Sequence, residues 1–143
     1  MTLLDAYALI AFVADEPAAG HVEELLRAGE SRILVANLAE SIDITHRVHG
    51  LAATETRSAI EPLLGGTLVP VVSGEVHAWH AAELRGRHYD RRERPLSLTD
   101  CFLLAHAVDE NEQIATADPP LAAAARAEGV EVVALPDRHG RIP

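Results

Sequence analysis

The stretch TLLDAYALIAF at residues 2–12 indicates the fold of this chain, because a single acid in it joins a buried strand to a helix. Residues 2–4 include a short apolar run typical of a strand inside a parallel sheet. Asp5 follows at once, and Ala6–Ala14 has the pattern of a helix. A charged side chain beside segments that form the core is costly unless something compensates it. The same need for compensation arises at three other acids along the chain.

Strands and helices alternate in the rest of the sequence. We expect further strands at 32–36, 67–72, 113–116 and 130–135, and further helices at 18–28, 37–49, 54–64, 73–87, 98–108 and 119–128. Alternating strands and helices predict an α/β fold whose parallel sheet is covered on both faces. Pro70 cannot donate a ladder hydrogen bond, so we expect the third strand at an edge of the sheet.

The composition is that of one globular domain. The chain has 143 residues, 48% of them hydrophobic, and we expect a single domain over 1–135 followed by a polar, loosely held tail at 136–143. The single Cys excludes an internal disulfide and fits a reducing compartment, so we expect a cytoplasmic protein. The N-terminus does not resemble a signal peptide, and no apolar run approaches the ~18 residues that span a membrane.

The charge balance argues against indiscriminate binding to nucleic acid. There are 12 basic residues, all Arg, against 22 acidic ones, for a net charge of -10. Phosphates repel such a protein at long range, so an RNA-binding role needs a local basic patch or bound cations. RGRHYDRRER at 85–94 is the candidate patch, either as an RNA contact or as a solvated segment with internal ion pairs. Its candidate RNA-binding residues are Arg85, Arg87, Arg91 and Arg92.

Four acids lie at the predicted starts of helices. Asp5 and Asp118 follow strands directly, and we expect Glu40 and Asp100 in the first turns of their helices. Each acid alone has a simple explanation as a helix cap. The patterns that suggest capping are Asp5 before its helix, Asn37-x-x-Glu40, Ser97-x-x-Asp100 and Asp118 before Pro119.

Together the acids suggest more than capping, because the carboxyl ends of parallel strands meet at one edge of a sheet. Two carboxylates ~4 Å apart repel by roughly 4 kcal/mol at an effective dielectric of ~20. Helix N-termini offset only ~0.3–1 kcal/mol for each acid. Such a cluster must hold protons or bind a cation, and oxygen ligands favour Mg²⁺ or Mn²⁺. A metal there would activate water for phosphodiester hydrolysis.

Four short motifs resemble those of the PIN-domain nucleases, and the likeness is greatest to VapC-type toxins of bacterial toxin–antitoxin pairs. The motifs are LLDAYALIAF at 3–12, NLAES at 37–41, LSLTD at 96–100 and ATADP at 115–119. The resemblance implies a three-layer α/β/α sandwich with a central, mainly parallel five-stranded sheet. It also implies an endoribonuclease that depends on Mg²⁺ or Mn²⁺, and a homodimer held by a cognate VapB-like antitoxin.

The resemblance also assigns roles to residues. Asp5 and Asp100 match the main metal ligands, and Glu40 and Asp118 match the acids that complete or orient the metal site. Thr116 matches a hydroxyl residue that supports the site. The one departure from the family pattern is Tyr7, two positions after Asp5. The family commonly has Ser or another small polar residue there. The larger Tyr7 either keeps a polar contact at longer reach or narrows the pocket.

Other readings are weaker. A phosphoacceptor receiver domain needs a Lys, and this chain has none. A haloacid-dehalogenase-like phosphatase needs Asp-x-Asp after the first strand, where Tyr7 occupies the third position. The serious alternative is a non-catalytic PIN-like module that binds an antitoxin or RNA. His77 and His80 suggest a metal pair but lack further ligands, and we expect Cys101 to be an apolar core residue.

Overall fold

The computed structural model describes all residues, 1–143, and shows the predicted alternation of strands and helices. The strands are β1 (Thr2–Leu4), β2 (Ser31–Leu34), β3 (Leu68–Val71), β4 (Gln113–Thr116) and β5 (Val132–Ala134). The helices are α1 (Ala6–Val13), α2 (Ala19–Ala28), α3 (Val35–Arg47), α4 (Ala53–Leu64), α5 (Glu75–His88), α6 (Leu98–Glu110) and α7 (Pro119–Ala127).

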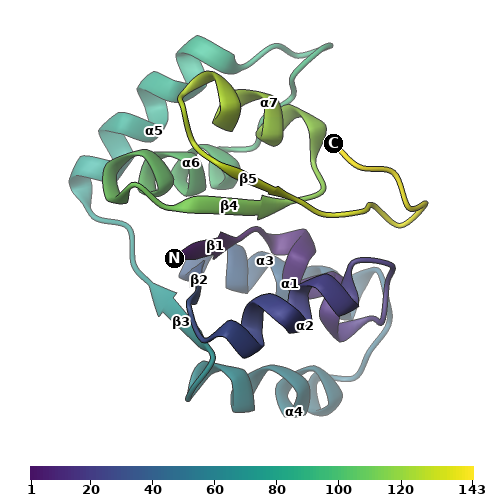
Figure 1. Ribbon diagram of the computed structural model, residues 1–143. Coiled ribbons are helices and arrows are strands. Elements are labelled where there is room, and N and C mark those ends of the chain that lie inside the picture. Colours follow the sequence, from purple (N-terminus) through teal and green to yellow (C-terminus); the bar gives the residue numbers. More distant parts are fainter.

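All five strands form one parallel sheet in the order β3-β2-β1-β4-β5, so the predicted α/β class is confirmed. Leu3, on the central strand, pairs with Arg32 on one side and Ile114 on the other. β3 lies at an edge of the sheet, where Pro70, which has no N–H, does not interrupt the ladder of hydrogen bonds. Figure 1 shows the sheet crossing the middle of the molecule between two groups of helices.

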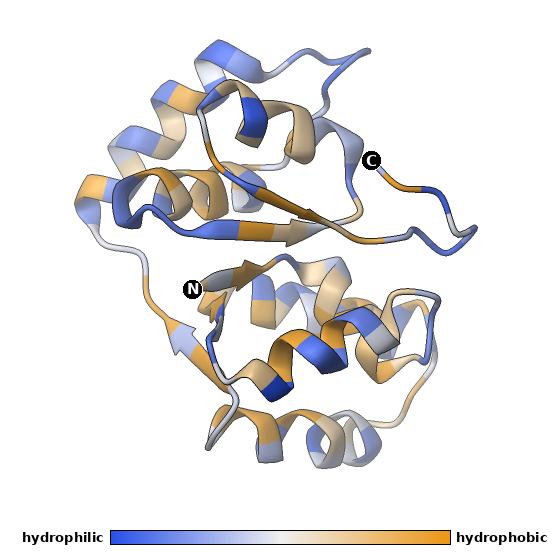
Figure 2. Cartoon of the chain, viewed as in Figure 1, coloured by the Kyte–Doolittle hydropathy of each residue, from blue (hydrophilic) through white to orange (hydrophobic).

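Each face of the sheet has its own core, because side chains alternate along a strand. Leu3 and Ile114 pack with α5, α6 and α7, whereas Leu4 and Ala115 pack with α1, α2 and α4. Leu38 and Ile42 of α3 also border this second core. Figure 2 shows apolar residues on the strands and on the helices of both groups. The predicted three-layer sandwich is therefore confirmed.

The strand order reverses between β1 and β4, which fixes where a ligand site is expected. The chain builds β2 and β3 on one side of β1 and then returns to place β4 on the other side. The backbone N–H of Asp5, just beyond β1, donates to the carbonyl of Ala115 in β4 at 3.2 Å. Open α/β sheets bind ligands beyond the carboxyl ends of their strands at this switch point.

One misplaced boundary bears directly on the site. We expected a strand over 32–36, but β2 ends at Leu34 and α3 begins at Val35. An apolar run such as this cannot separate strand from helix by its pattern alone. Asn37 is consequently not a cap: it lies inside α3 and is fully buried, and Leu34 is the N-cap residue. Glu40 falls in the second turn of the helix rather than the first.

No helix in this structure is both long enough and apolar enough to cross a lipid bilayer.

Candidate active site

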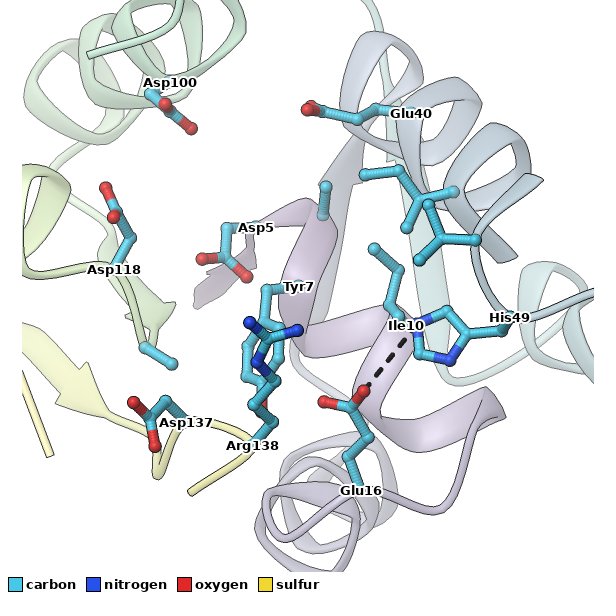
Figure 3. Close-up of a pocket in the computed structure, with 14 residues that line it drawn as sticks. Asp5, Tyr7, Ile10, Glu16, Glu40, His49, Asp100, Asp118, Asp137 and Arg138 are labelled. Carbon is cyan, nitrogen blue, oxygen red and sulfur yellow. Dashed lines mark ion pairs between the residues drawn. The ribbon is translucent and has the colours of Figure 1, made fainter. Parts of the chain in front are cut away.

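One pocket, with a volume of about 420 Å³, brings the four predicted acids together. It opens beyond the carboxyl ends of β1 and β4, at the switch point of the sheet. Figure 3 shows the acids arranged around it, on segments that are distant in the sequence. The predicted acids that line the pocket are Asp5, Glu40, Asp100 and Asp118, and two further acids, Glu16 and Asp137, also line it.

Asp5 is the most deeply buried of the four acids, with only 4% of its surface exposed. It is the N-cap of α1, and its Oδ1 accepts a hydrogen bond of 2.7 Å from the N–H of Ala8. The pKa of Asp5 is raised to about 7, chiefly by burial and also by the charges of Asp100 and Asp118, against the lowering effects of Thr116 and Ala8. The predicted cap is confirmed, and the site holds this carboxylate at a cost in electrostatic energy.

Asp118 and Thr116 are tied together at the end of β4. Thr116 Oγ1 accepts a 2.9 Å hydrogen bond from the N–H of Asp118. Asp118 Oδ2 in turn caps α7 by accepting a hydrogen bond of 3.0 Å from the N–H of Leu121. Pro119 occupies the first helical position, as predicted. Burial raises the pKa of Asp118, Leu121 lowers it, and Asp100 raises it. Thr116 thus acts on two acids of the site, because it also lowers the pKa of Asp5.

Asp100 is fixed by a capping box at the start of α6, as predicted. Its N–H donates to Ser97 Oγ at 3.0 Å, and its Oδ2 accepts from the N–H and hydroxyl of Ser97 at 3.0 and 2.6 Å. These bonds engage Oδ2 and leave Oδ1 without a partner in the chain. The charge of Asp100 raises the pKa of each of the other three acids. It is therefore the acid that couples the whole cluster.

Glu40 reaches the pocket from α3. The hydroxyl of the next residue, Ser41, is buried and lies 3.1 Å from the carbonyl of Ala6 and 2.7 Å from that of Asn37. This contact holds α3 against the start of α1 and so positions Glu40 opposite Asp5. Burial raises the pKa of Glu40, and the charge of Asp100 raises it further.

The donor set suits a hard divalent cation, although the acids do not form a closed cage. No three Asp, Glu, His or Cys side chains lie close enough together to hold an ion between them. Mg²⁺ does not require this, because it usually keeps several waters and binds through one or two carboxylates. Asp5 and Asp100, with the unpartnered Oδ1 of the latter, are the residues best placed to hold it, and the other two acids suit its bound waters.

The C-terminal segment, which we expected as a polar, loosely held tail, forms part of the pocket wall. The hydroxyl of Tyr7 donates to the carbonyl of Pro136 at 3.2 Å, and Asp137 and Arg138 line the pocket. Figure 3 shows Arg138 on the same side of the pocket as Tyr7. Tyr7 therefore keeps a polar contact, but with the tail of the chain.

Sequence reasoning missed four of the polar residues that line the pocket. Asp137 and Arg138 follow β5 and lie at the same strand-end edge as Asp5, so the rule that found the acids also applied to them. Glu16 and His49 form an ion pair of 3.7 Å between Oε1 and Nε2. No local sequence pattern indicates that pair, because it depends on the ends of α1 and α3 meeting in space.

None of the four Arg residues proposed for RNA contact lines this pocket. Arg87 donates to both carboxylate oxygens of Glu128, at 2.8 and 3.0 Å. Arg85 stacks over the ring of Tyr89, with 4.4 Å from its Cζ to the ring centroid. Arg91 and Arg92 lie exposed in the turn that follows α5. Their contact with RNA stays a prediction.

The structure also bears on the other interpretations of His77, His80 and Cys101. The ring of His77 stacks on that of His106 with centroids 3.7 Å apart, and His80 Nδ1 lies 2.9 Å from a carboxylate oxygen of Asp109. Cys101 is buried in the core, and burial raises the pKa of its thiol to about 11. A buried thiol of this kind remains protonated, as expected of a core residue.

Comparison with known proteins gives a consistent picture. The model of the PIN domain family matches residues 2–135. Comparison with curated proteins yields no match. Solved structures of similar fold include a sarcin-ricin loop cleaving toxin, VapC20 of Mycobacterium tuberculosis, with a TM-score of 0.69, 18% identity, and coverage of 87% of this chain and 95% of that one. VapBC2 of Rickettsia felis, bound to a DNA fragment from its promoter, has a TM-score of 0.66 and 16% identity, with coverage of 92% of this chain and 96% of that one. FitAcB of Neisseria gonorrhoeae has a TM-score of 0.61 and 20% identity, with coverage of 92% of this chain and 96% of that one.

Proposed function

This chain belongs to the PIN domain family, and on that premise we propose that it is an endoribonuclease dependent on Mg²⁺ or Mn²⁺ that acts as the toxin of a VapBC-type toxin–antitoxin pair. The observation that carries the proposal is the convergence of Asp5, Glu40, Asp100 and Asp118 on one pocket at the switch point of the sheet. Capping explains three of these acids individually, but it does not explain why all four face the same space.

The chemistry follows from the oxygen-rich pocket. A divalent cation there would polarise a phosphoryl oxygen and lower the pKa of a bound water. Asp5 and Asp100 would hold the cation, and Glu40 and Asp118 would orient its water ligands by accepting hydrogen bonds. Thr116 holds the backbone of Asp118 by accepting a hydrogen bond from its N–H, and it lowers the pKa of Asp5. The chain itself then supplies positioning and charge, and no side chain is needed as a nucleophile.

The partners follow from the structural relatives. One similar structure is a toxin–antitoxin complex from Klebsiella pneumoniae, another is VapBC2 bound to a DNA fragment from its promoter, and a third is FitAB bound to an IR36 DNA fragment. We extend this to the present chain as a cognate VapB-like antitoxin. An antitoxin segment bearing cations would complement the acidic pocket, because opposite potentials favour association.

An exposed apolar face supports the expected homodimer. Val72, Val76 and Trp79 are 77%, 73% and 69% exposed, on α5 and the segment that precedes it. Large exposed aromatic residues in such a patch are typical of interfaces. Trp79→Ser should therefore convert a dimer to a monomer in sedimentation experiments, and an unchanged mass would contradict this assignment.

The experiment for the proposed activity is RNA cleavage under metal control. Purified protein is incubated with total RNA and Mg²⁺ or Mn²⁺, with and without EDTA, alongside Asp5→Asn, Asp100→Asn and the control Asp43→Asn. Asp43 carries the same charge but pairs with Arg47 on the outside of α3. We expect EDTA to stop cleavage, both pocket variants to lose it, and the control to retain it.

Two results would contradict the proposal. Cleavage that survives Asp5→Asn and Asp100→Asn would indicate another site or a contaminant. A complete absence of cleavage by the unmodified protein, with RNA or antitoxin binding retained, would favour the non-catalytic module.

A further inference from the structure

The acid pocket contains one arginine, and it comes from the C-terminal segment. Of the twelve Arg residues in the chain, only Arg138 lines this pocket. Its side chain is exposed, and it makes no ion pair and no hydrogen bond within the chain. By contrast, the neighbouring Arg141 is engaged by Asp137. Arg138 is therefore a cation available to an incoming ligand.

A compact turn presents Arg138. The carboxylate of Asp137 accepts from the backbone N–H groups of His139 and Arg141 at 2.7 and 2.9 Å, and from Nε of Arg141 at 2.8 Å. The N–H of Asp137 also donates to the carbonyl of Arg141 at 2.8 Å. These bonds hold the pKa of Asp137 at about 2, with the Arg141 contacts as the largest favourable cause. Because Arg141 neutralises Asp137, the charge of Arg138 stays uncompensated inside the turn.

Tyr7 fixes this turn to the site. Its hydroxyl donates to the carbonyl of Pro136, two residues before Arg138, and both Pro136 and the preceding Leu135 are buried. Tyr7 lies two residues after Asp5, in the first turn of α1, so the bond links the acid end of the pocket to the arginine.

We propose that Arg138 binds a phosphate of the RNA strand next to the one that is cleaved, and that Tyr7 is the residue that positions it. The proposal rests on the proposed nuclease function and adds a substrate contact to it. A chain with a net charge of -10 needs local cations to hold a polyanion, and a guanidinium fork matches phosphate geometry. The acids serve the phosphate at one end of the pocket, and Arg138 serves its neighbour at the other.

The test compares Arg138→Gln and Arg138→Lys with Arg57→Gln, an equal charge change at an exposed ion pair on α4. Binding of a fluorescein-labelled single-stranded RNA dodecamer is measured in EDTA by fluorescence anisotropy, at several salt concentrations. We expect Arg138→Gln to weaken binding roughly tenfold and to reduce the slope of log K against log salt by about 0.7, the value for one lost phosphate contact. Arg138→Lys should restore the slope but only part of the affinity.

Cleavage of the same RNA in Mn²⁺ gives the kinetic counterpart. Arg138→Gln should raise KM with kcat nearly unchanged, because a flanking contact contributes equally to the bound substrate and the transition state. Tyr7→Phe should raise KM in the same direction by a smaller factor. In the double variant Tyr7→Phe/Arg138→Gln the two effects should not add, because Tyr7 acts through Arg138.

The outcomes separate the two proposals. If Arg138→Gln matches Arg57→Gln in affinity, salt slope and KM, the proposed role of Arg138 is wrong, and the proposed nuclease function is unaffected. If the effects of Tyr7→Phe and Arg138→Gln add fully, the positioning role of Tyr7 is wrong. If the unmodified protein never cleaves RNA, the nuclease proposal fails, while the binding data in EDTA still decide the role of Arg138.

Discussion

The carboxylate of Asp100 raises the pKa of Asp5 from across the pocket, although the two residues come from opposite parts of the chain. Burial is the larger cause, and together they raise the pKa of Asp5 from 3.8 to about 7. The fold therefore keeps an acid where its charged form is disfavoured. Such groups concentrate at functional sites, because stability alone would not retain them.

This relationship predicts that Asp5→Asn stabilises the metal-free protein. Between pH 4 and pH 7 the folded protein holds a proton on Asp5 that the unfolded chain releases, so the stability of the unmodified protein falls as pH rises through this window. Asn removes the penalty and can still accept from Ala8. At pH 8 in EDTA we expect a gain on the order of 2–4 kcal/mol in the free energy of unfolding, since one pKa unit corresponds to about 1.4 kcal/mol.

Urea unfolding at pH 4 and pH 8 measures this effect, with Asp43→Asn as the control. Arg47 lowers the pKa of Asp43, so the control should show no gain at pH 8. Equal stability of Asp5→Asn and the unmodified protein at pH 8 would show that the site imposes no electrostatic penalty.

Asp118 has two roles that different substitutions can separate. Asn keeps an oxygen able to accept from the N–H of Leu121, whereas Ala removes the cap of α7. We expect both variants to lose RNA cleavage, but only Asp118→Ala to lose a further ~1 kcal/mol of stability. Thermal unfolding and a cleavage assay on the two variants check this, and full activity of Asp118→Asn would reduce the residue to a helix cap.

A partly buried ion pair spans the central strand β1 by joining β2 to the residue that precedes β4. Arg32 on β2 contacts Glu112, which precedes β4, at 2.5 Å, and the side chain of Glu112 is only 6% exposed. Arg32→Gln leaves this carboxylate without its cation, so we expect a loss of about 3 kcal/mol. Arg57→Gln, at an exposed pair, should cost ~0.5 kcal/mol or less. Urea unfolding of the two variants compares them, and equal losses would contradict this view of the pair.

The parts of the site that sequence could predict are those linked to strand ends and helix caps. Asp5, Asp100 and Asp118 carry local signals, because Asp5 and Asp118 cap the helices that follow them and Asp100 completes the capping box of α6 with Ser97. The edge position of β3 followed from Pro70 alone. These features are local in the chain, so the residue pattern contains them.

Other parts depended on contacts that no local pattern specifies. The start of α3 was misplaced because Val35 and Ala36 continue an apolar run that suits a strand or a helix equally. The role of the tail was missed because the Tyr7 contact to Pro136 joins opposite ends of the chain. The Glu16–His49 pair likewise exists only after α1 and α3 have packed.

Titration of the metal-free protein with Mn²⁺ by isothermal calorimetry tests the central claim most directly. We expect the unmodified protein and Asp43→Asn to bind Mn²⁺ in the range that supports RNA cleavage. Asp5→Asn and Asp100→Asn should weaken binding at least tenfold, because each removes one anionic ligand from a small set. Equal Mn²⁺ affinity in all four proteins would contradict the account, since the acids of the pocket would then not be the cation's ligands.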